Sequence, residues 1–149
     1  MGQQQLLLVI LVTIIVGVAT VVAINTFSSA ADNANLDAVR NDMATIASSA
    51  QGYYMKPDMM GGGGNSFTGM TFDDLAFATD GSESSGATEV TNGNGTYTLS
   101  INADNFTITA VPAQADGNIV AYVEKDCMDM SDYDPNGSAS SPGSCSSSS

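Results

Sequence analysis

The loop between the two cysteines holds the residues whose spacing comes closest to a recognisable binding chemistry. Asp132, Asp134 and Asn136 stand at alternate positions, and Gly137 follows them. This is the order of the first half of an EF-hand calcium loop. Oxygen ligands at alternate positions curl around a hard cation, and the glycine permits the sharp turn. The backbone carbonyl of Ser138 would continue the series.

The second half of the calcium pattern is missing. Its twelfth position is Gly143 instead of a bidentate glutamate, although Asp126 and Asp129 lie close enough in sequence to substitute. Asp, Asn, Pro and Gly are also common turn residues, so a solvated acidic turn is the alternative interpretation. No cofactor is required, and calcium is the one candidate. The candidate ligands are Asp132, Asp134, Asn136 and Ser138.

The two cysteines, Cys127 and Cys145, both lie near the C-terminus. An even cysteine count behind an export-type N-terminus predicts a disulfide formed outside the cytoplasm. By the chain-entropy argument, closing this ring stabilises the fold by about 3 kcal/mol. Two free thiols are the less favoured alternative, because the segment between the cysteines has little else to hold it.

The sequence contains no recognisable catalytic constellation. It has no histidine, which excludes a Ser-His or Cys-His triad and removes the commonest general base. The glycines at 61–64 are not followed by the Lys-Ser/Thr of a phosphate-binding loop. Sixteen acidic residues against three basic ones give a net charge of -13, which repels nucleic-acid phosphates. We therefore expect neither an enzyme nor a nucleic-acid binder that uses a basic surface.

The element that dominates the chain is an unbroken apolar run from Leu6 to Ile24. As a helix, this run would span roughly 28 Å, about one bilayer core. A small domain cannot cover such a segment, so lipid or copies of the same helix must do so. The residues expected to pack in this way are Leu6, Leu7, Leu8, Ile10, Leu11, Ile14, Ile15, Val18, Val21 and Val22.

The apolar run continues into an amphipathic stretch with no helix breaker before Gly52 and Pro57. Spacings of three and four place one apolar stripe on a helix. The stripe consists of Leu36, Val39, Met43, Ile46, Ala50 and Tyr53. The face expected to meet water carries Asp32, Asn35, Asp37, Arg40, Asn41, Asp42 and Ser48. The pattern predicts a single helix from near residue 2 to about residue 55.

The rest of the chain alternates as β-strands do. Residues 96–101, 106–111 and 119–123 predict strands, and 102–105 has turn chemistry. We expect an antiparallel meander of three or four strands, with the helical stripe covering its apolar face. Glycines 61–64 are interpreted as a flexible joint. In the loop that follows, the residues expected to pack on the core are Phe67, Phe72, Leu75 and Phe77.

These features together resemble the type IV pilins of the type IV filament superfamily. The resemblance lies in the apolar N-terminal run, its amphipathic extension, the helix-to-sheet order and the C-terminal cysteine pair. It covers the whole architecture, although its sequence-level signal is confined to about the first 57 residues. It implies an α+β fold in which a long N-terminal α-helix packs on a small antiparallel β-sheet.

The resemblance also implies a life cycle. A prepilin peptidase would cut before Met1 or after Gly2, and the new first residue, Met1 or Gln3, would be methylated. The subunit would wait in the membrane and then enter an extracellular helical homopolymer through the pilus assembly machinery, for adhesion or motility. The chain departs from the bacterial pattern at mature position five. That position is Gln5 or Leu7, depending on the frame, where such pilins usually carry a glutamate.

The expected organisation has two parts. Residues 1–57 form the helix, hydrophobic over 1–30 and amphipathic over 31–57. Residues 58–149 form the β-sheet head with a disulfide loop at 127–145. Two other functions fit the same layout: a secretion-system pseudopilin that forms a short fibre, and a monomeric membrane-anchored binding domain. A calcium requirement would favour the first and abundant extracellular filaments would count against it, whereas cross-linking of neighbouring N-terminal helices would exclude the second.

Overall fold

The computed structural model describes residues 2–81 and 84–145. Helix α1 (Gly2–Met55) has 54 residues, so the prediction of one helix from near residue 2 to about 55 is confirmed. It ends just before Pro57, which has no backbone N–H and disfavours helical backbone in the residue that precedes it. The chain divides into two compact units, Met1–Ala34 and Asn35–Ser149.

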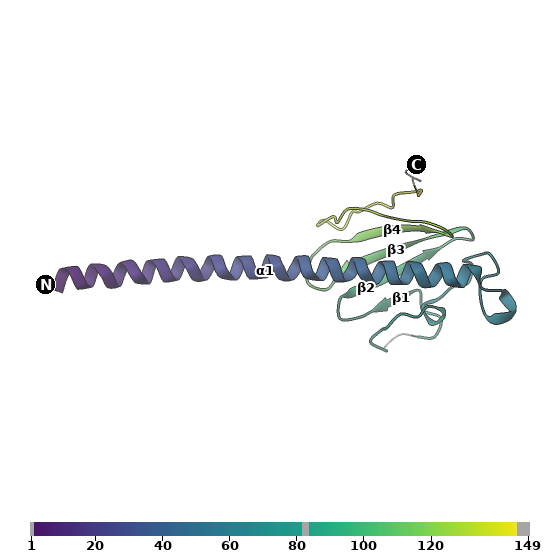
Figure 1. Cartoon of the computed structure of the whole chain (residues 1–149), viewed down its shortest axis with the longest axis horizontal. Helices are drawn as coiled ribbons and strands as arrows, with labels where there is room; N and C mark the ends of the chain where they lie inside the picture. Colours follow the sequence, from purple (N-terminus) through teal and green to yellow (C-terminus); the bar gives the residue numbers. More distant parts are fainter. Residues whose placement is uncertain (1, 82–83, 146–149) are drawn as a thin grey trace. The chain divides into compact units, whose positions relative to one another are not determined.

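The second unit contains a five-stranded antiparallel sheet in sequence order, shown in Figure 1. Its strands are β1 (Glu89–Thr91), β2 (Gly95–Ile101), β3 (Asn105–Pro112), β4 (Ile119–Glu124) and β5 (Met128–Met130). The predicted meander is confirmed, and its three predicted strands lie within β2, β3 and β4. The predicted number of three or four strands was too low, because the two edge strands have only three residues each.

The register of the central hairpin places its apolar residues on one face. Leu99 pairs with Ile108, and Tyr97 pairs with Ala110. All four of these residues are buried. The turn between the strands closes as the sequence predicts, with the amide of Asn102 donating to the carbonyl of Asn105 at 2.8 Å. Alternation along β2 and β3 therefore builds one apolar face from every second residue.

The amphipathic half of α1 covers this face. Five residues of the predicted stripe are buried, Ala47 joins them, and Tyr53 is half-buried. The loop after the helix adds Phe67, whose ring lies 4.8 Å from that of Tyr54 and 5.0 Å from that of Phe106. The loop prediction is confirmed: Phe67, Phe72 and Leu75 are buried, and Phe77 is partly buried against the core. The short 3-10 helix η2 (Phe72–Asp74) lies within this loop.

The glycine-rich segment is a hydrogen-bonded turn, so its interpretation as a flexible joint was wrong. All four glycine amides, at 61–64, donate to backbone carbonyls of residues 53–58, between the last turn of α1 and the first residue of the 3-10 helix η1 (Asp58–Met60). A Cβ on Gly62 would collide with the carbonyl of Lys56, and Gly61 has a φ of 73°. These positions need glycine because the chain reverses against its own backbone.

Candidate functional site

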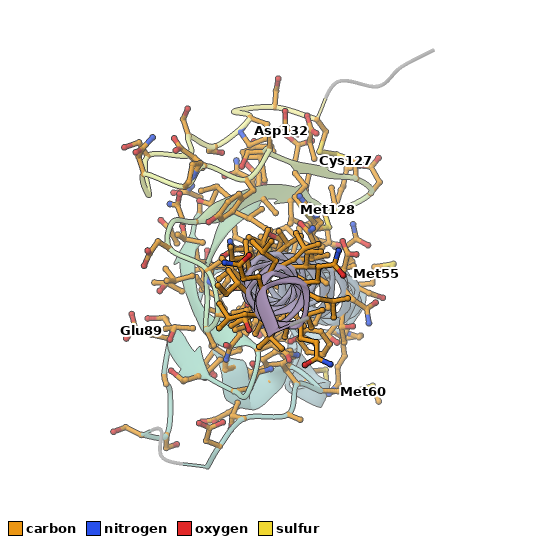
Figure 2. All side chains as sticks on the ribbon, turned by 90° about the vertical axis from the view of Figure 1, so that its left-hand side faces the viewer. Met55, Met60, Glu89, Cys127, Met128 and Asp132 are labelled. Atoms are coloured by element: carbon orange, nitrogen blue, oxygen red, sulfur yellow. A yellow bond between two sulfur atoms is a disulfide. The ribbon has the colours of Figure 1, made fainter. Side chains whose placement is uncertain are left out.

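The apolar half of α1 is exposed in the part of the chain that the structure describes. All ten residues predicted to pack in an assembly are exposed, with exposed fractions between 48% at Ile10 and 66% at Leu7. Phe27, further along the same helix, is 81% exposed. Figure 2, which looks along the helix, shows side chains radiating around its axis. The apolar surface is therefore continuous around the helix and not confined to a stripe.

Three threonines in this half satisfy their hydroxyls within the helix itself. Thr13 donates to the carbonyl of Val9 at 2.8 Å, and Thr20 and Thr26 bond in the same way to residues four positions earlier. No polar partner outside the helix is needed for them, so the segment can enter an apolar environment without an unpaired hydroxyl. By length and composition, this helix can cross a membrane or serve as a signal.

The predicted processing site lies at the beginning of the helix. Gly2 and Gln3 belong to the first turn of α1, which contains no acidic residue, and Met1 lies outside the described residues. The first turn presents backbone N–H groups that attract negative charge. Gln5 supplies only a neutral amide there. Cleavage and methylation remain predictions.

Asp42 is the polar centre of the contact between α1 and the sheet. Its Oδ2 accepts hydrogen bonds from the Tyr97 hydroxyl at 2.7 Å, Asn94 Nδ2 at 2.8 Å and Asn92 Nδ2 at 3.0 Å. Burial by itself raises the pKa of Asp42, but the three donors favour the carboxylate and hold the pKa below its ordinary value of 3.8. Burial and the nearby carboxylate raise the pKa of Tyr97, which keeps its hydroxyl a donor.

Two further polar side chains of α1 bond to the backbone around the sheet. Asn35 is only 7% exposed; its Nδ2 donates to the carbonyl of Asn94 at 2.9 Å, and its Oδ1 accepts from the amide of Gln114 at 3.1 Å. Gln51 Nε2 donates to the carbonyl of Glu124 at 3.1 Å. The sequence prediction that Asn35 and Asp42 face water was therefore wrong. Asn35 lies four residues before Val39, and Asp42 lies four residues before Ile46. This helical spacing from buried residues was the sequence signal that both side chains flank the buried stripe.

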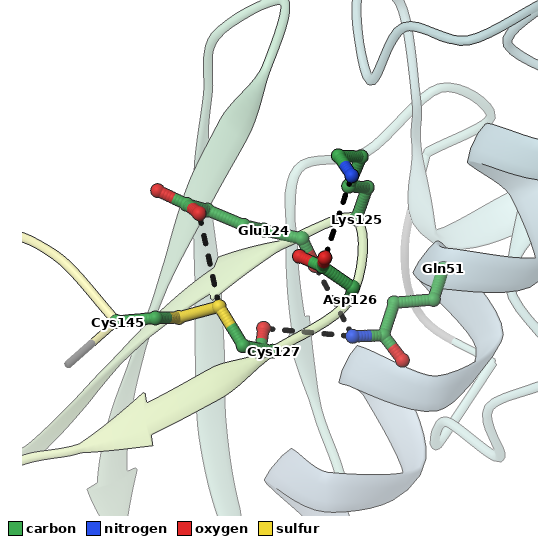
Figure 3. Close-up of polar contacts among 6 residues, drawn as sticks. All are labelled: Gln51, Glu124, Lys125, Asp126, Cys127 and Cys145. Carbon is green, nitrogen blue, oxygen red and sulfur yellow. Dashed lines mark hydrogen bonds and ion pairs between the residues drawn. A yellow bond between two sulfur atoms is a disulfide. The ribbon is translucent and has the colours of Figure 1, made fainter. Parts of the chain in front are cut away.

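The predicted disulfide is present. Cys127 and Cys145 are bonded, with their Cα atoms 6.2 Å apart, so the free-thiol alternative is excluded. Figure 3 shows Glu124 beside this bond, with Oε2 lying 3.7 Å from the Cys127 sulfur. A disulfide sulfur has no proton to donate and is no thiolate ligand, so this contact is neither a hydrogen bond nor a metal site.

The candidate calcium residues form a turn beside β4. Asp132 is exposed, whereas Asp134 is half-buried and bridges Asn118 through backbone hydrogen bonds. The Oδ1 atom of Asp134 accepts the amide of Asn136 at 2.8 Å, the contact of an Asx-turn. Asn136 and Ser138 are exposed. Over residues 2–81 and 84–145, Asp132 and Asp134 belong to no group of three His, Cys, Asp or Glu side chains whose ligand atoms all lie within 4.8 Å of one another.

The few basic side chains differ in their partners. Arg40 pairs with Asp37 at 3.3 Å, and Lys125 pairs with Asp126 at 3.3 Å. Lys56 is exposed and forms no ion pair within the described part of the chain. Against a net charge of -13, this leaves one unneutralised cation at the end of α1.

The folded chain has the α+β layout of a type IV pilin: one long N-terminal helix packed on a small antiparallel sheet. Its exposed apolar helix, its disulfide and its helix-to-sheet hydrogen bonds are the features from which a function can be argued. No family model, no curated protein and no solved structure matches this chain.

Proposed function

We propose that this chain is the structural subunit of a type IV-like pilus, a helical homopolymer built through its apolar N-terminal helix. The observation that carries the proposal is the exposure of fifteen large apolar side chains between Leu6 and Phe27. At about 1.5 kcal/mol for each side chain, leaving them in water would cost on the order of 20 kcal/mol. This exceeds the whole stability of a typical domain, so the helix must be covered by lipid or by other copies.

The continuity of α1 favours copies of the chain as the final cover. The apolar residues and the buried stripe belong to one helix, and no Gly or Pro interrupts it from Asn25 to Gln51. A simple anchor needs no such continuity, whereas a polymer subunit needs its apolar segment joined directly to its folded domain. The internal threonine hydrogen bonds also allow the segment to exchange lipid for protein neighbours.

The proposal includes a membrane-inserted stage before assembly, processing by a prepilin peptidase, and an extracellular filament for adhesion or motility. The bonded cysteine pair supports an oxidising compartment for the second unit. The acidic composition supports a charged outer coat that keeps filaments apart in solution.

Electron microscopy of filaments sheared from cells, combined with the intact mass of their subunit, tests the proposal. We expect thin filaments made of this chain, and a mass that shows a trimmed and methylated N-terminus. The competing candidate is a monomeric membrane-anchored domain, because a single apolar helix is enough for an anchor. An unprocessed chain that stays in the membrane fraction, with no cross-links between neighbouring N-terminal helices, would favour that candidate.

A further inference from the structure

Three stretches of the second unit match the acceptor pattern for N-linked glycans, an Asn followed by any residue except Pro and then by Ser or Thr. They begin at Asn94, Asn105 and Asn136. The pattern is short and often arises by chance, so the sequence alone does not tell which match is modified. A glycosylating enzyme needs a free side-chain amide nitrogen on three residues that it can reach. The structure separates the three matches on these two points.

The match at Asn94 is built into the contact between α1 and the sheet. Its Nδ2 donates to Asp42 at 2.8 Å, and its carbonyl accepts Nδ2 of Asn35 at 2.9 Å. Gly95, the middle residue, is buried, and a Cβ there would lie 2.4 Å from the carbonyl of Val111. A sugar on this nitrogen would lie against α1 and disturb the hydrogen bonds that hold the helix to the sheet.

The match at Asn105 lies in strand β3. Asn105 is half-buried, its Oδ1 accepts Nδ2 of Asn102 at 2.9 Å, and its carbonyl accepts the amide of Asn102 at 2.8 Å. Phe106, the middle residue, is 0% exposed, and its ring lies 5.0 Å from that of Phe67. Thr107, the third residue, is paired with β4. These three residues could reach an enzyme only if β3 left the sheet.

The match at Asn136 is the exposed one. Its three residues and the preceding Pro135 are all exposed. Neither Nδ2 of Asn136 nor the hydroxyl of Ser138 forms a hydrogen bond within the part of the chain that the structure describes. The backbone amide of Asn136, by contrast, donates to Oδ1 of Asp134 at 2.8 Å. The side-chain nitrogen is therefore available for modification, and the backbone that carries it is ordered.

Asn118 fixes both ends of this turn. Its amide and carbonyl bond to the carbonyl and amide of Asp134 at 3.0 and 3.1 Å, and its Oδ1 accepts the amide of Ala139 at 3.0 Å. Residues 135–138 lie between these two anchors, and Gly137 has a φ of 69° there. Because this turn contributes no strand to the sheet, it can bind in an enzyme's site while the sheet stays paired.

We propose that Asn136 is an N-glycosylation site, modified by an enzyme that takes its sugar from a lipid-phosphate-linked oligosaccharide. The Nδ2 nitrogen forms a bond to the anomeric carbon of the sugar, and the bond from that carbon to the phosphate oxygen breaks. The lipid phosphate leaves with the electron pair, and Nδ2 gives up one proton to a base of the enzyme. The bonded cysteine pair supports export of this unit, which such a modification of a surface loop requires.

Peptide mass spectrometry of the chain purified from the cells that make it tests the inference. Cleavage after Lys125 places Asn136 in the peptide that begins at Asp126, separate from Asn94 and Asn105. We expect this peptide to be heavier by the mass of a sugar chain, and the peptide that ends at Lys125 to have its unmodified mass. An unmodified peptide from Asp126 onward, or a glycan on Asn94 or Asn105, would overturn the inference.

Three substitutions distinguish a sugar on Asn136 from a sugar on a neighbouring serine. Asn136→Gln and Ser138→Ala both break the acceptor pattern, and we expect both to remove the added mass completely. Ser138→Thr keeps the pattern and is the matched control, so its added mass should remain. Both side chains are exposed, so the three variants should fold, and their urea unfolding checks this. Added mass that persists in Asn136→Gln would identify a sugar on a hydroxyl and reject the assignment.

This inference goes beyond the proposed function and does not depend on it, because an anchored monomer would present the same turn. If filaments form from a chain whose peptide from Asp126 onward is unmodified, the glycosylation site is overturned and the filament proposal stands. If that peptide is glycosylated in a chain that stays in the membrane and forms no filaments, the filament proposal fails and the glycosylation site stands.

Discussion

Asp42 concentrates three hydrogen bonds on one carboxylate oxygen, so its removal leaves Tyr97, Asn92 and Asn94 without their acceptor. Hydrogen bonds to a charged group contribute more than neutral ones, and unpaired buried donors are costly. We expect Asp42→Ala to lower the free energy of unfolding by about 2–4 kcal/mol. Urea unfolding of the full chain in detergent, followed by tyrosine fluorescence, measures the change.

Asp37→Ala is the matched control for this substitution. Asp37 lies on the same helix and pairs with Arg40, but its side chain is 79% exposed. An exposed pair of this kind contributes at most about 0.5 kcal/mol. If the two alanine variants are equally stable, the hydrogen bonds at Asp42 do not hold the helix to the sheet.

The same carboxylate makes stability depend on pH. The pKa of Asp42 is lower in the folded chain than its ordinary value of 3.8, so the unfolded chain binds the proton more readily. The stabilisation is present above that ordinary value and is lost as pH falls through the folded pKa. We expect the stability of the wild type to decline below about pH 4, and the decline to be shallower in Asp42→Asn. Parallel curves for the two chains would rule out Asp42 as the source.

The calcium prediction also belongs to single residues. The Oδ1 atom of Asp134 already accepts the Asn136 amide, and among the described residues neither aspartate belongs to a group of three acidic, His or Cys side chains with mutually close ligand atoms. We therefore expect millimolar calcium to leave the melting temperature of the full chain unchanged within about 1 °C. A rise that disappears in Asp132→Asn would restore the calcium site and favour the pseudopilin alternative.

At the scale of an element, the disulfide helps to hold the segment that follows β5 in place. This segment also has the Asn118–Asp134 bridge and a hydrogen bond from the Tyr133 hydroxyl to the Asp116 carbonyl. We expect the Cys127→Ser/Cys145→Ser chain to lose about 3 kcal/mol of stability, because the unfolded chain regains its loop entropy. Measuring the free energy of unfolding with and without reductant gives the loss, and reductant should not change the stability of the double variant. A reductant effect that persists in the double variant would exclude the disulfide as its cause.

Helices and strands with a regular hydrophobic periodicity could be predicted from the sequence. Strands that form only because a neighbouring strand offers hydrogen bonds could not. The stripe through Val39, Met43 and Ile46 repeats at helical spacing, and alternation marks β2 and β3. Strands β1 and β5 have three residues each, too few for a period, and exist because β2 and β4 offer them hydrogen bonds. Asn35 and Asp42 were misassigned because polarity alone does not reveal the sheet turns that receive them.

At the scale of the molecule, the proposal requires that the apolar helix serve assembly while the second unit folds without it. Ile14 is 59% exposed on the apolar helix, belongs to the unit Met1–Ala34 and is not one of the core residues. An aspartate there costs about 2.5–3.5 kcal/mol for each copy that enters lipid, and a similar penalty follows in any apolar polymer core. The second unit should not sense the change.

We therefore expect Ile14→Asp to abolish filaments and to reduce membrane insertion, while the urea unfolding of the second unit stays within about 0.5 kcal/mol of wild type. Thr88→Asp is the control, because it adds the same charge to an exposed position of the second unit. Electron microscopy and membrane fractionation of both variants are the measurements. Filaments of Ile14→Asp as abundant as those of the wild type would show that the polymer does not bury the apolar helix. In that case lipid alone would account for its exposed side chains, and the proposal that the filament is built through the apolar helix would be rejected.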